Sequence, residues 1–376
     1  MTDTQRPTLL QDTASLTAKL QEQRRTVDFD PYDIHVLQLL SQLETGQIWT
    51  APAYQRQFRW DVERCSSLVE SLLLGIPIPN LFMATDEKGA WEVVDGVQRL
   101  SAIAKFAGNA TVRAKLNVNG PLVLEGLDKL DNFNGLSFND LPQNIQTHFH
   151  TRSLRVVTLS DKSNPLVRYD LFERLNTGGI GLTPQEIRDC VFQGPFAKRL
   201  EDLSKEANFR KVVKLTAEQE KNGTAEECVL RFFAFRDRYE QFVHSVVDFL
   251  NDYMADATRP PKPGSGTVPF DMEPGTAAFH KTFAELAKAF PEGLRRDGRK
   301  GGVTSLILYE AVAVGASLAL KSRSKFTTAG LSKWLASEEL RGFTTGATNN
   351  KSAVKGRIEF CRDRFLGKPY VSTASA

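Results

Sequence analysis

The sequence predicts an α/β protein, or more narrowly an α+β protein, in which a small mixed-sheet domain precedes a mainly helical domain. Short apolar runs of the kind that form strands lie before residue 160, at 79–84, 91–95 and 154–160. From Pro165 onward, apolar residues recur with helical spacing instead. A length of 376 residues is also more typical of two domains than of one. We therefore expect a tail at 1–30, a sheet domain at 31–160 and a helical domain at 161–376.

Local signals mark the elements of the first half. Asp61 is placed to cap a helix that Gly75 ends, and the two strands 79–84 and 91–95 flank a polar turn. The next helix carries its apolar residues up to Gly108. His148 and His150 alternate as on a strand. Because no further ligands flank them, we expect no metal site.

The second half reads as a series of helices. Pro165 begins a helix that ends near Gly178. Thr183, Pro184 and Glu186 then combine an N-cap, a proline in the first turn and a capping box. Residues 225–254 are expected to form one or two long helices, and 259–275 a Pro/Gly-rich loop.

Composition and charge limit the class of protein. The net charge is only +3, the hydrophobic content is 41%, and there is no run of 18 apolar residues, so we expect neither a polycation nor a membrane span. The four cysteines are far apart and form no C-x-x-C pair, which argues against a zinc site or a disulfide framework. With no secretory signal in the first residues, we expect a cytoplasmic protein.

The C-terminal region is basic. Residues 295–376 contain 15 Lys and Arg against 6 Asp and Glu, a local excess of +9. On the helix predicted near 350–365, Lys351, Lys355 and Arg362 fall on one face and apolar residues on another. We expect this face to contact nucleic acid or an acidic partner, with an ordinary solvated helix face as the alternative.

The stretch 91–106 contains the chemically most informative turn. A strand ends in Asp95-Gly96, and a helix begins directly with Gln98 and Arg99 in its first turn. The first N–H groups of a helix and its positive dipole suit an anion. Gly96 permits close approach and Arg99 can clamp phosphate, while Asp95 could hold Mg²⁺, orient water or pair with an arginine. Gln98 could orient water or bond a phosphate oxygen. The simpler alternative is a common turn in which Arg99 pairs back with Asp95.

Two other stretches add to this motif. In residues 51–60, arginines alternate with Tyr54, Phe58 and Trp60, a pattern that can bind phosphate or stack on bases, or else form an aromatic edge strand. Residues 172–183 contain a helix end, a Gly-rich turn and a new capped helix, which could equally be a plain helical corner.

Taken together, the three stretches resemble the N-terminal domain of GmrSD-type restriction endonucleases, which is similar to the ParB/sulfiredoxin fold. The resemblance covers roughly residues 34–365, and Val97 departs from it because the family usually has Gln at that position. The matching positions are Tyr54, Gln55, Arg56, Asp95, Gly96, Gln98, Arg99, Arg174 through Gly179, and Leu182 to Arg188.

This resemblance implies a nucleotide-binding, NTP-hydrolysing module of prokaryotic anti-phage defence. The cofactor would be GTP, ATP or CTP with Mg²⁺. The alternative is a non-catalytic DNA-binding or partner-regulating module. By the resemblance, Asp95, Gln98 and Arg99 would be catalytic, and the nucleotide would contact Tyr54, Gln55, Arg56, Gly96, Arg174, Asn176 and Thr177.

Relatives that cut DNA carry a His-dependent nuclease domain. After residue 250 this chain has a single histidine, His280, and neither a His-Asn-His nor an Asp…Glu-x-Lys pattern. We therefore expect a chain without its own nuclease, a separate nuclease or effector protein as partner, and DNA as a further ligand. Whether the protein forms a homo-oligomer stays open.

Overall fold

The chain divides into two compact units, residues 1–178 and 179–376, which are described separately. The computed structural model describes residues 29–50, 60–85, 89–159, 165–175, 182–259, 271–295, 302–323, 325–346 and 348–369. The division at 178 follows helix α8 (Pro165–Leu175), whereas the boundary expected from the sequence, at 160, precedes that helix. Among the described helices, none is both long and apolar enough to cross a membrane.

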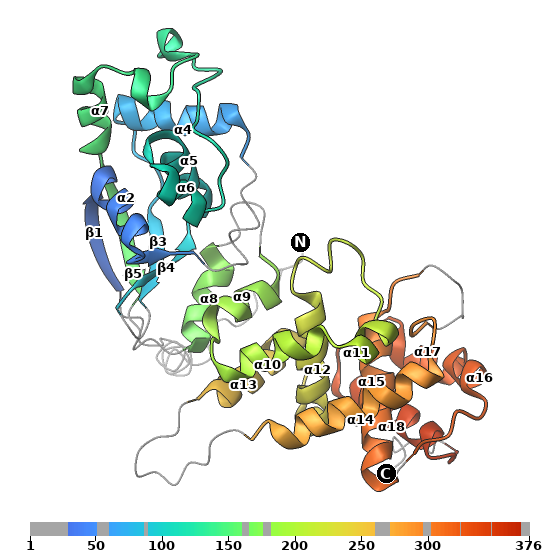
Figure 1. Cartoon of the computed structure of the whole chain (residues 1–376). Coiled ribbons are helices and arrows are strands. Elements are labelled where there is room, and N and C mark those ends of the chain that lie inside the picture. The colour runs from blue at the N-terminus through green and yellow to red at the C-terminus, as the bar shows by residue number, and fades with distance from the viewer. Residues whose placement is uncertain are drawn as a thin grey trace, which may run out of the picture. The chain divides into compact units, whose positions relative to one another are not determined.

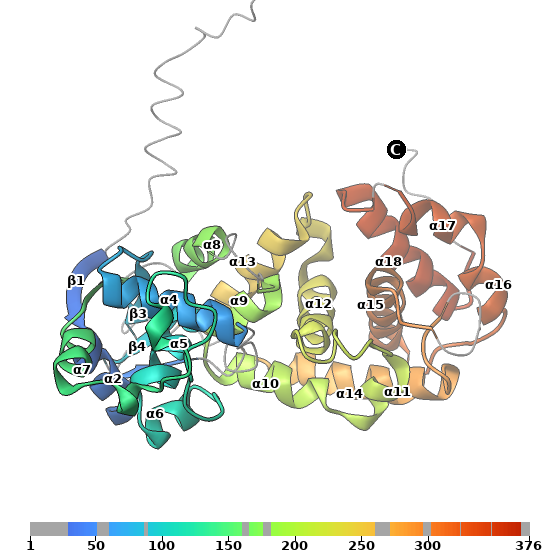
Figure 2. The same cartoon turned by 90° about the horizontal axis from the view of Figure 1, so that it is seen from above.

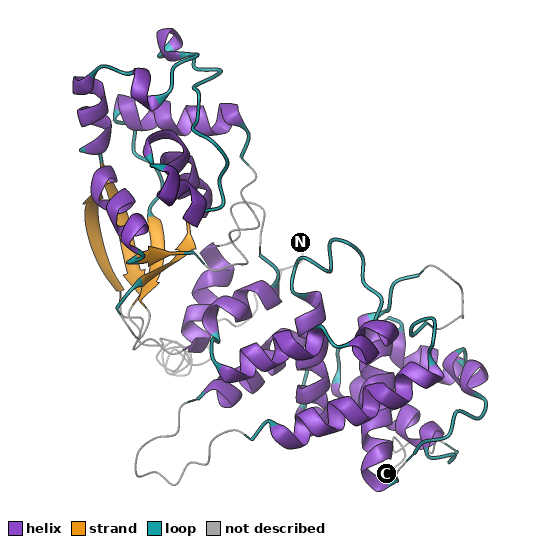
Figure 3. Cartoon of the chain, viewed as in Figure 1, coloured by secondary structure: helices purple, strands orange, loops and turns teal. Residues whose placement is uncertain are grey.

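Unit 1 is built on a five-stranded mixed sheet with the order β1-β5-β3-β4-β2 (Figures 1 and 3). The pairs β1/β5 and β3/β4 are antiparallel, and the pairs β5/β3 and β4/β2 are parallel. This confirms the predicted mixed sheet. The strands are β1 (Phe29–His35), β2 (Ile48–Trp49), β3 (Leu81–Thr85), β4 (Trp91–Asp95) and β5 (Ser153–Leu159).

The helix predicted between Asp61 and Gly75 begins and ends where its local signals place it. The carboxylate of Asp61 accepts the N–H of Arg64 at 2.8 Å, and Gly75 ends the same helix with φ 81°. The described helices of this unit are α2 (Val36–Thr45), α4 (Val62–Leu74), α5 (Val97–Ala107), α6 (Ala110–Lys115), α7 (Gln143–His150) and α8, with short 3₁₀ turns at Asp131–Phe133 and Phe138–Asp140.

The strand interpretation of His148 and His150 is wrong, because both lie in helix α7. His148 contacts the carbonyl of Leu73 at 3.1 Å, and the His150 ring packs 4.8 Å from that of Phe138. A short window in which polar residues flank Phe149 fits period 2 as well as one helical turn. Burial of Phe149 among other rings favours the helix.

Within its described residues, unit 2 consists of helices joined by loops, without a strand (Figure 3). The capping box predicted at Thr183 and Glu186 is present, with Pro184 in the first turn. The predicted segment 225–254 forms two helices, α12 and α13. The helices are α9 (Pro184–Val191), α10 (Pro195–Ser204), α11 (Ala207–Val212), α12 (Thr224–Arg238), α13 (Val246–Thr258), α14 (Glu273–Ala289), α15 (Leu306–Ser322), α16 (Leu331–Leu335), α17 (Glu338–Thr344) and α18 (Lys351–Phe365), with a 3₁₀ turn at Tyr239–Gln241.

The core of unit 2 centres on α15, against which α12, α14 and α18 pack (Figures 1 and 2). Phenylalanine rings from several helices meet on this core; Phe279 and Phe283, for example, lie 4.4 Å apart. The approach of α15 to α18 is close because Gly315 has no side chain. A Cβ there would lie 2.6 Å from the Cβ of Cys361. All four cysteines are buried and free, as an inert role predicts.

Candidate functional site

The turn between β4 and α5 has a conformation that requires glycine. Gly96 has φ 100°, a left-handed value, and a Cβ at this position would collide with the side chain of Leu81. Gly96 also brings no side chain to cap the helix, although its carbonyl accepts the N–H of Leu100 at 2.8 Å. The N-terminal end of α5 therefore has no side-chain cap from Gly96, and Leu81 lies where a Cβ of residue 96 would be.

The side chain of Arg99 forms hydrogen bonds with residues around the turn between β4 and α5. Its Nη2 donates to Oδ2 of Asp95 at 2.5 Å. Its Nη1 donates to the carbonyl of Asn80 at 2.8 Å and also to that of Pro79. The side chain is only 12% exposed, against 35% for Asp95. The structure thus has the pairing that the sequence left as the simpler alternative, and Arg99 ties residues 79–80 to the start of α5.

An irregularity in the pairing of β3 with β4 changes the direction of Asp95. Met83 pairs with Val93, but Phe82 pairs with Asp95, so β4 has one extra residue at this point. Simple alternation would place Glu92 and Asp95 on opposite faces of the sheet. With the extra residue, both lie on one face, and Glu92 is 2% exposed. Glu92 was not predicted to lie on the same face as Asp95, because nothing in the run 91–95 indicates the bulge.

Gln98 connects this turn to the second motif. Its Oε1 accepts the N–H of Trp60 at 3.4 Å, and the guanidinium of Arg64 lies 4.7 Å from the centre of the Trp60 ring. Trp60 is the first described residue after the stretch that contains Tyr54, Gln55 and Arg56, and those three residues lie outside the described part of the chain. The structure therefore brings the C-terminal end of this stretch next to the first turn of α5.

The third motif approaches the same strand. Helix α8 packs against β4 within unit 1. Arg174 lies exposed in the last turn of α8, and Asn176 and Thr177, which follow it, lie outside the described residues. The described flank of the second motif thus contacts the first turn of α5, and the described flank of the third contacts β4.

A surface groove of unit 1, about 390 Å³ in volume, does not include this turn. Val62, Lys105, Leu122 and Val123 line it, together with neighbouring residues, but none of residues 95–99 does. The candidate site therefore rests on the motif contacts and not on this groove.

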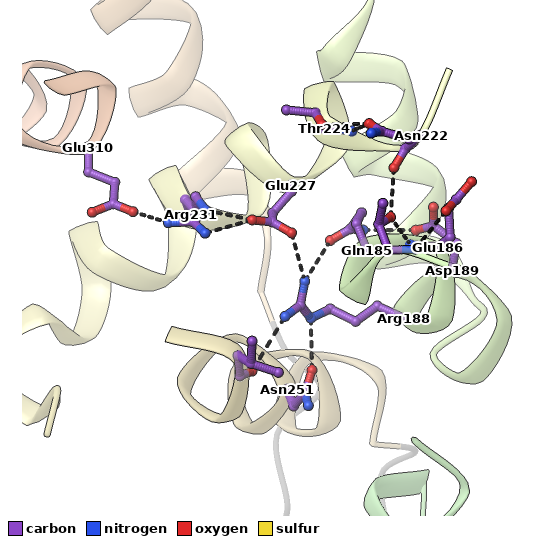
Figure 4. Close-up of polar contacts among 12 residues, drawn as sticks. Gln185, Glu186, Arg188, Asp189, Asn222, Thr224, Glu227, Arg231, Asn251 and Glu310 are labelled. Atoms are coloured by element: carbon purple, nitrogen blue, oxygen red, sulfur yellow. Dashed lines mark hydrogen bonds and ion pairs between the residues drawn. The ribbon is translucent and has the colours of Figure 1, made fainter. Parts of the chain in front are cut away.

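Unit 2 contains a buried ionic network that starts in the last matched motif (Figure 4). Arg188, 1% exposed, donates through Nε to Oδ1 of Asn251 at 2.8 Å and through Nη1 to Glu227 at 3.2 Å. Glu227 also binds Arg231 at 2.6 Å. Burial opposes ionisation of Glu227, but Arg231 and Arg188 outweigh it and lower the pKa of this carboxyl.

The network continues to the far helices of the unit. Arg231 binds Glu310, whose other oxygen accepts from Arg357 at 2.5 Å. Glu310 and Arg357 are fully buried, and Arg357 also donates to the carbonyl of Thr348 at 2.7 Å. Side chains of alternating charge on α9, α12, α15 and α18 thus form one continuous series of ion pairs. The sequence did not predict this network.

Asp189 lies beside this network on α9. Burial raises the pKa of its carboxyl to about 7, opposed by the hydrogen bond from Gln185 at 2.8 Å and reinforced by the negative charge of Glu226. Burial therefore moves the pKa of this carboxyl from the usual acidic range toward neutral pH.

The three predicted basic residues of α18 have different surroundings. Lys351 is exposed, and Lys355 is half-buried. Arg362 binds Asp363 at 2.9 Å and Glu359 at 3.4 Å, so its charge is already balanced.

The fold and the turn define a class of protein. Its first domain has a mixed sheet, a helix that begins directly after a glycine, and a carboxylate paired with an arginine. A helical region follows this domain. Residues 36–193 match the family described as GmrSD restriction endonuclease, N-terminal domain. This part of the chain is therefore similar to that N-terminal domain, and the match suggests a component of a restriction-type defence system. No curated protein and no solved structure matches the chain, so the likeness to the ParB/sulfiredoxin fold stays a prediction.

Proposed function

We propose that unit 1 binds and hydrolyses a nucleoside triphosphate with Mg²⁺ at the turn between β4 and α5, and that a separate nuclease or effector carries out the cut. The observation that supports this proposal is the convergence of the three motif flanks: Trp60 on Gln98, and α8 on β4. Residues that are far apart in sequence and meet near the start of a helix can form a phosphate site.

In this proposal each residue has a narrower role than the sequence alone gave it. The backbone N–H groups that begin α5 would donate hydrogen bonds to phosphate oxygens. Arg99 acts through Asp95, because Nη1 and Nη2 both bind protein atoms. The positive charge opposite the phosphates would come from Arg174, in the exposed last turn of α8, and from Arg56. The Mg²⁺ that accompanies the nucleotide would offset the remaining phosphate charge.

Thermal unfolding with ATP, GTP or CTP plus Mg²⁺ tests the proposal. A ligand that binds only the folded protein at about 100 times its Kd adds about 2.7 kcal/mol, or about 5–11 °C in Tm for a unit of this size. Arg174→Gln should reduce both the shift and the release of phosphate. Arg155→Gln serves as the matched control, because Arg155 is 51% exposed on β5 and pairs with Asp33. No shift with any nucleotide would refute the proposal.

The non-catalytic alternative has one observation in its favour. Lys321, Arg323 and Lys325 are all exposed at the end of α15, in the basic C-terminal region. Binding of DNA that weakens steeply with salt and does not respond to nucleotide would support this second function. Replacement of all three residues by Gln should then lower the slope of affinity against salt concentration.

A further inference from the structure

The two carboxylate oxygens of Asp95 have different surroundings. Oδ2 is bound to Arg99 at 2.5 Å. Within the described ranges, Oδ1 takes part in no hydrogen bond, and the side chain is 35% exposed. A carboxylate whose second oxygen is open to solvent offers one hydrogen-bond acceptor to a ligand.

The Asp95–Arg99 pair limits what that ligand group can be. The guanidinium is 12% exposed and donates to Asp95, Asn80 and Pro79, so it faces the protein. What reaches solvent is the carboxylate. A phosphate oxygen offers no proton to Oδ1 and would be repelled by it, whereas a hydroxyl can donate to it. The positive charge of Arg99 also lowers the attraction of this carboxylate for Mg²⁺.

Asp95 is also close in the chain to the expected phosphate position. Gly96 alone separates it from Val97, where α5 begins. In a nucleotide, the ribose is covalently joined to the first phosphate, so phosphates held at the helix start bring a sugar hydroxyl near the preceding residue. We infer that Asp95 is the residue that recognises the ribose, through a hydrogen bond from a 2′- or 3′-hydroxyl to Oδ1, and that the site selects ribonucleotides.

This inference rests on the proposed function and narrows it. It assigns Asp95 to the discrimination between sugars and not to metal binding. Arg99 holds the carboxylate in the orientation that leaves Oδ1 available to the sugar. Arg99 is therefore a positioning residue and Asp95 a specificity-determining one.

Calorimetric titration of the full chain with ATP, GTP and CTP, and with their 2′-deoxy and 3′-deoxy counterparts, tests the inference. A hydrogen bond to a charged group predicts about 10- to 100-fold weaker binding of one deoxy series. Asp95→Ala should bring the ratio to about one. Asp95→Asn, which keeps an acceptor without the charge, should keep a ratio of a few-fold. Asp128→Ala, at another position of unit 1, should keep the wild-type ratio.

The outcomes separate this inference from the proposed function. If the wild-type chain binds a ribonucleotide and both of its deoxy counterparts equally, ribose recognition by Asp95 is wrong and the nucleotide site stands. If the ratio is present and persists in Asp95→Ala, another residue reads the sugar and the inference also fails. If no nucleotide binds, both are refuted. Because the first comparison uses only the wild-type chain, it does not depend on the folding of a variant.

Discussion

Glu310 is the position at which the ionic network of unit 2 is most sensitive to substitution. Its carboxylate is fully buried and connects Arg231, 13% exposed, to Arg357, which is fully buried. In Glu310→Gln, Arg231 keeps its ion pair with Glu227 at 2.6 Å. Arg357 keeps the carbonyl of Thr348 and can gain at most a neutral amide oxygen from the new glutamine. The substitution therefore leaves one buried guanidinium without a counter-charge.

Breaking a buried ion pair by removing one partner costs about 3–5 kcal/mol. We expect Glu310→Gln to lower the free energy of unfolding by that amount, measured by urea unfolding followed by circular dichroism. Glu201→Gln is the surface control. Its carboxylate, 45% exposed on α10, pairs with Lys198 and Lys205, and the loss should stay below about 1 kcal/mol.

A second variant separates charge from packing. Glu310→Leu combined with Arg357→Met removes both members of the innermost pair and leaves no unbalanced charge there. Replacement of a whole buried pair by apolar residues is often neutral or stabilising, so the double variant should recover most of the loss. A loss below 1 kcal/mol for Glu310→Gln, or a double variant less stable than the single one, would refute the reasoning.

Three further predictions follow from other positions. Gly96→Ala forces a left-handed φ on alanine and a clash with Leu81, so it should lower stability by about 2–4 kcal/mol in thermal unfolding and abolish any nucleotide-induced shift. Gly315→Ala places a Cβ 2.6 Å from Cys361 and should cost about 1–3 kcal/mol, again read from Tm; no change in Tm would contradict the close approach of the two helices. Because the pKa of Asp189 is raised to about 7 in the folded protein, its contribution to stability is fully present below about pH 4 and is lost as the pH rises toward 7. Asp189→Asn should therefore become more stable relative to wild type over that range, by at most about 1.4 kcal/mol per pH unit, while Asp202→Asn, an exposed control on the same unit, should not.

Elements with a local cause could be predicted from the sequence. Asp61 accepts the N–H three residues on, Gly75 provides the left-handed C-cap, and Thr183 with Glu186 forms the capping box, all within a few residues of chain. The turn at Asp95-Gly96 was predicted for the same reason. These interactions depend on neighbouring residues, so a single sequence contains both partners in order.

Features that depend on distant partners could not be predicted. The bulge that turns Asp95 to the face of Glu92 arises in the pairing of β4 with β3, and a run of five residues gives no sign of it. Arg188 could be found as part of a motif. Its burial, however, depends on Glu227 and Asn251, which lie 39 and 63 residues further along the chain. A charged residue in a helical pattern is usually exposed, so sequence reasoning expects solvent where the structure has an ion pair.

The end of the family match has a consequence for how the protein can be divided. The match ends at residue 193, just beyond α9, yet α9 belongs to the second unit and is fastened there by Arg188. A fragment that stops at the end of the match would keep this guanidinium and lose every acceptor that Glu227, Asn251 and Val247 provide. The segment shared with relatives is therefore not an independent module in this chain. The family match and the compact units have their boundaries at different residues. A fragment that includes α9 must therefore also include the helices that bind it.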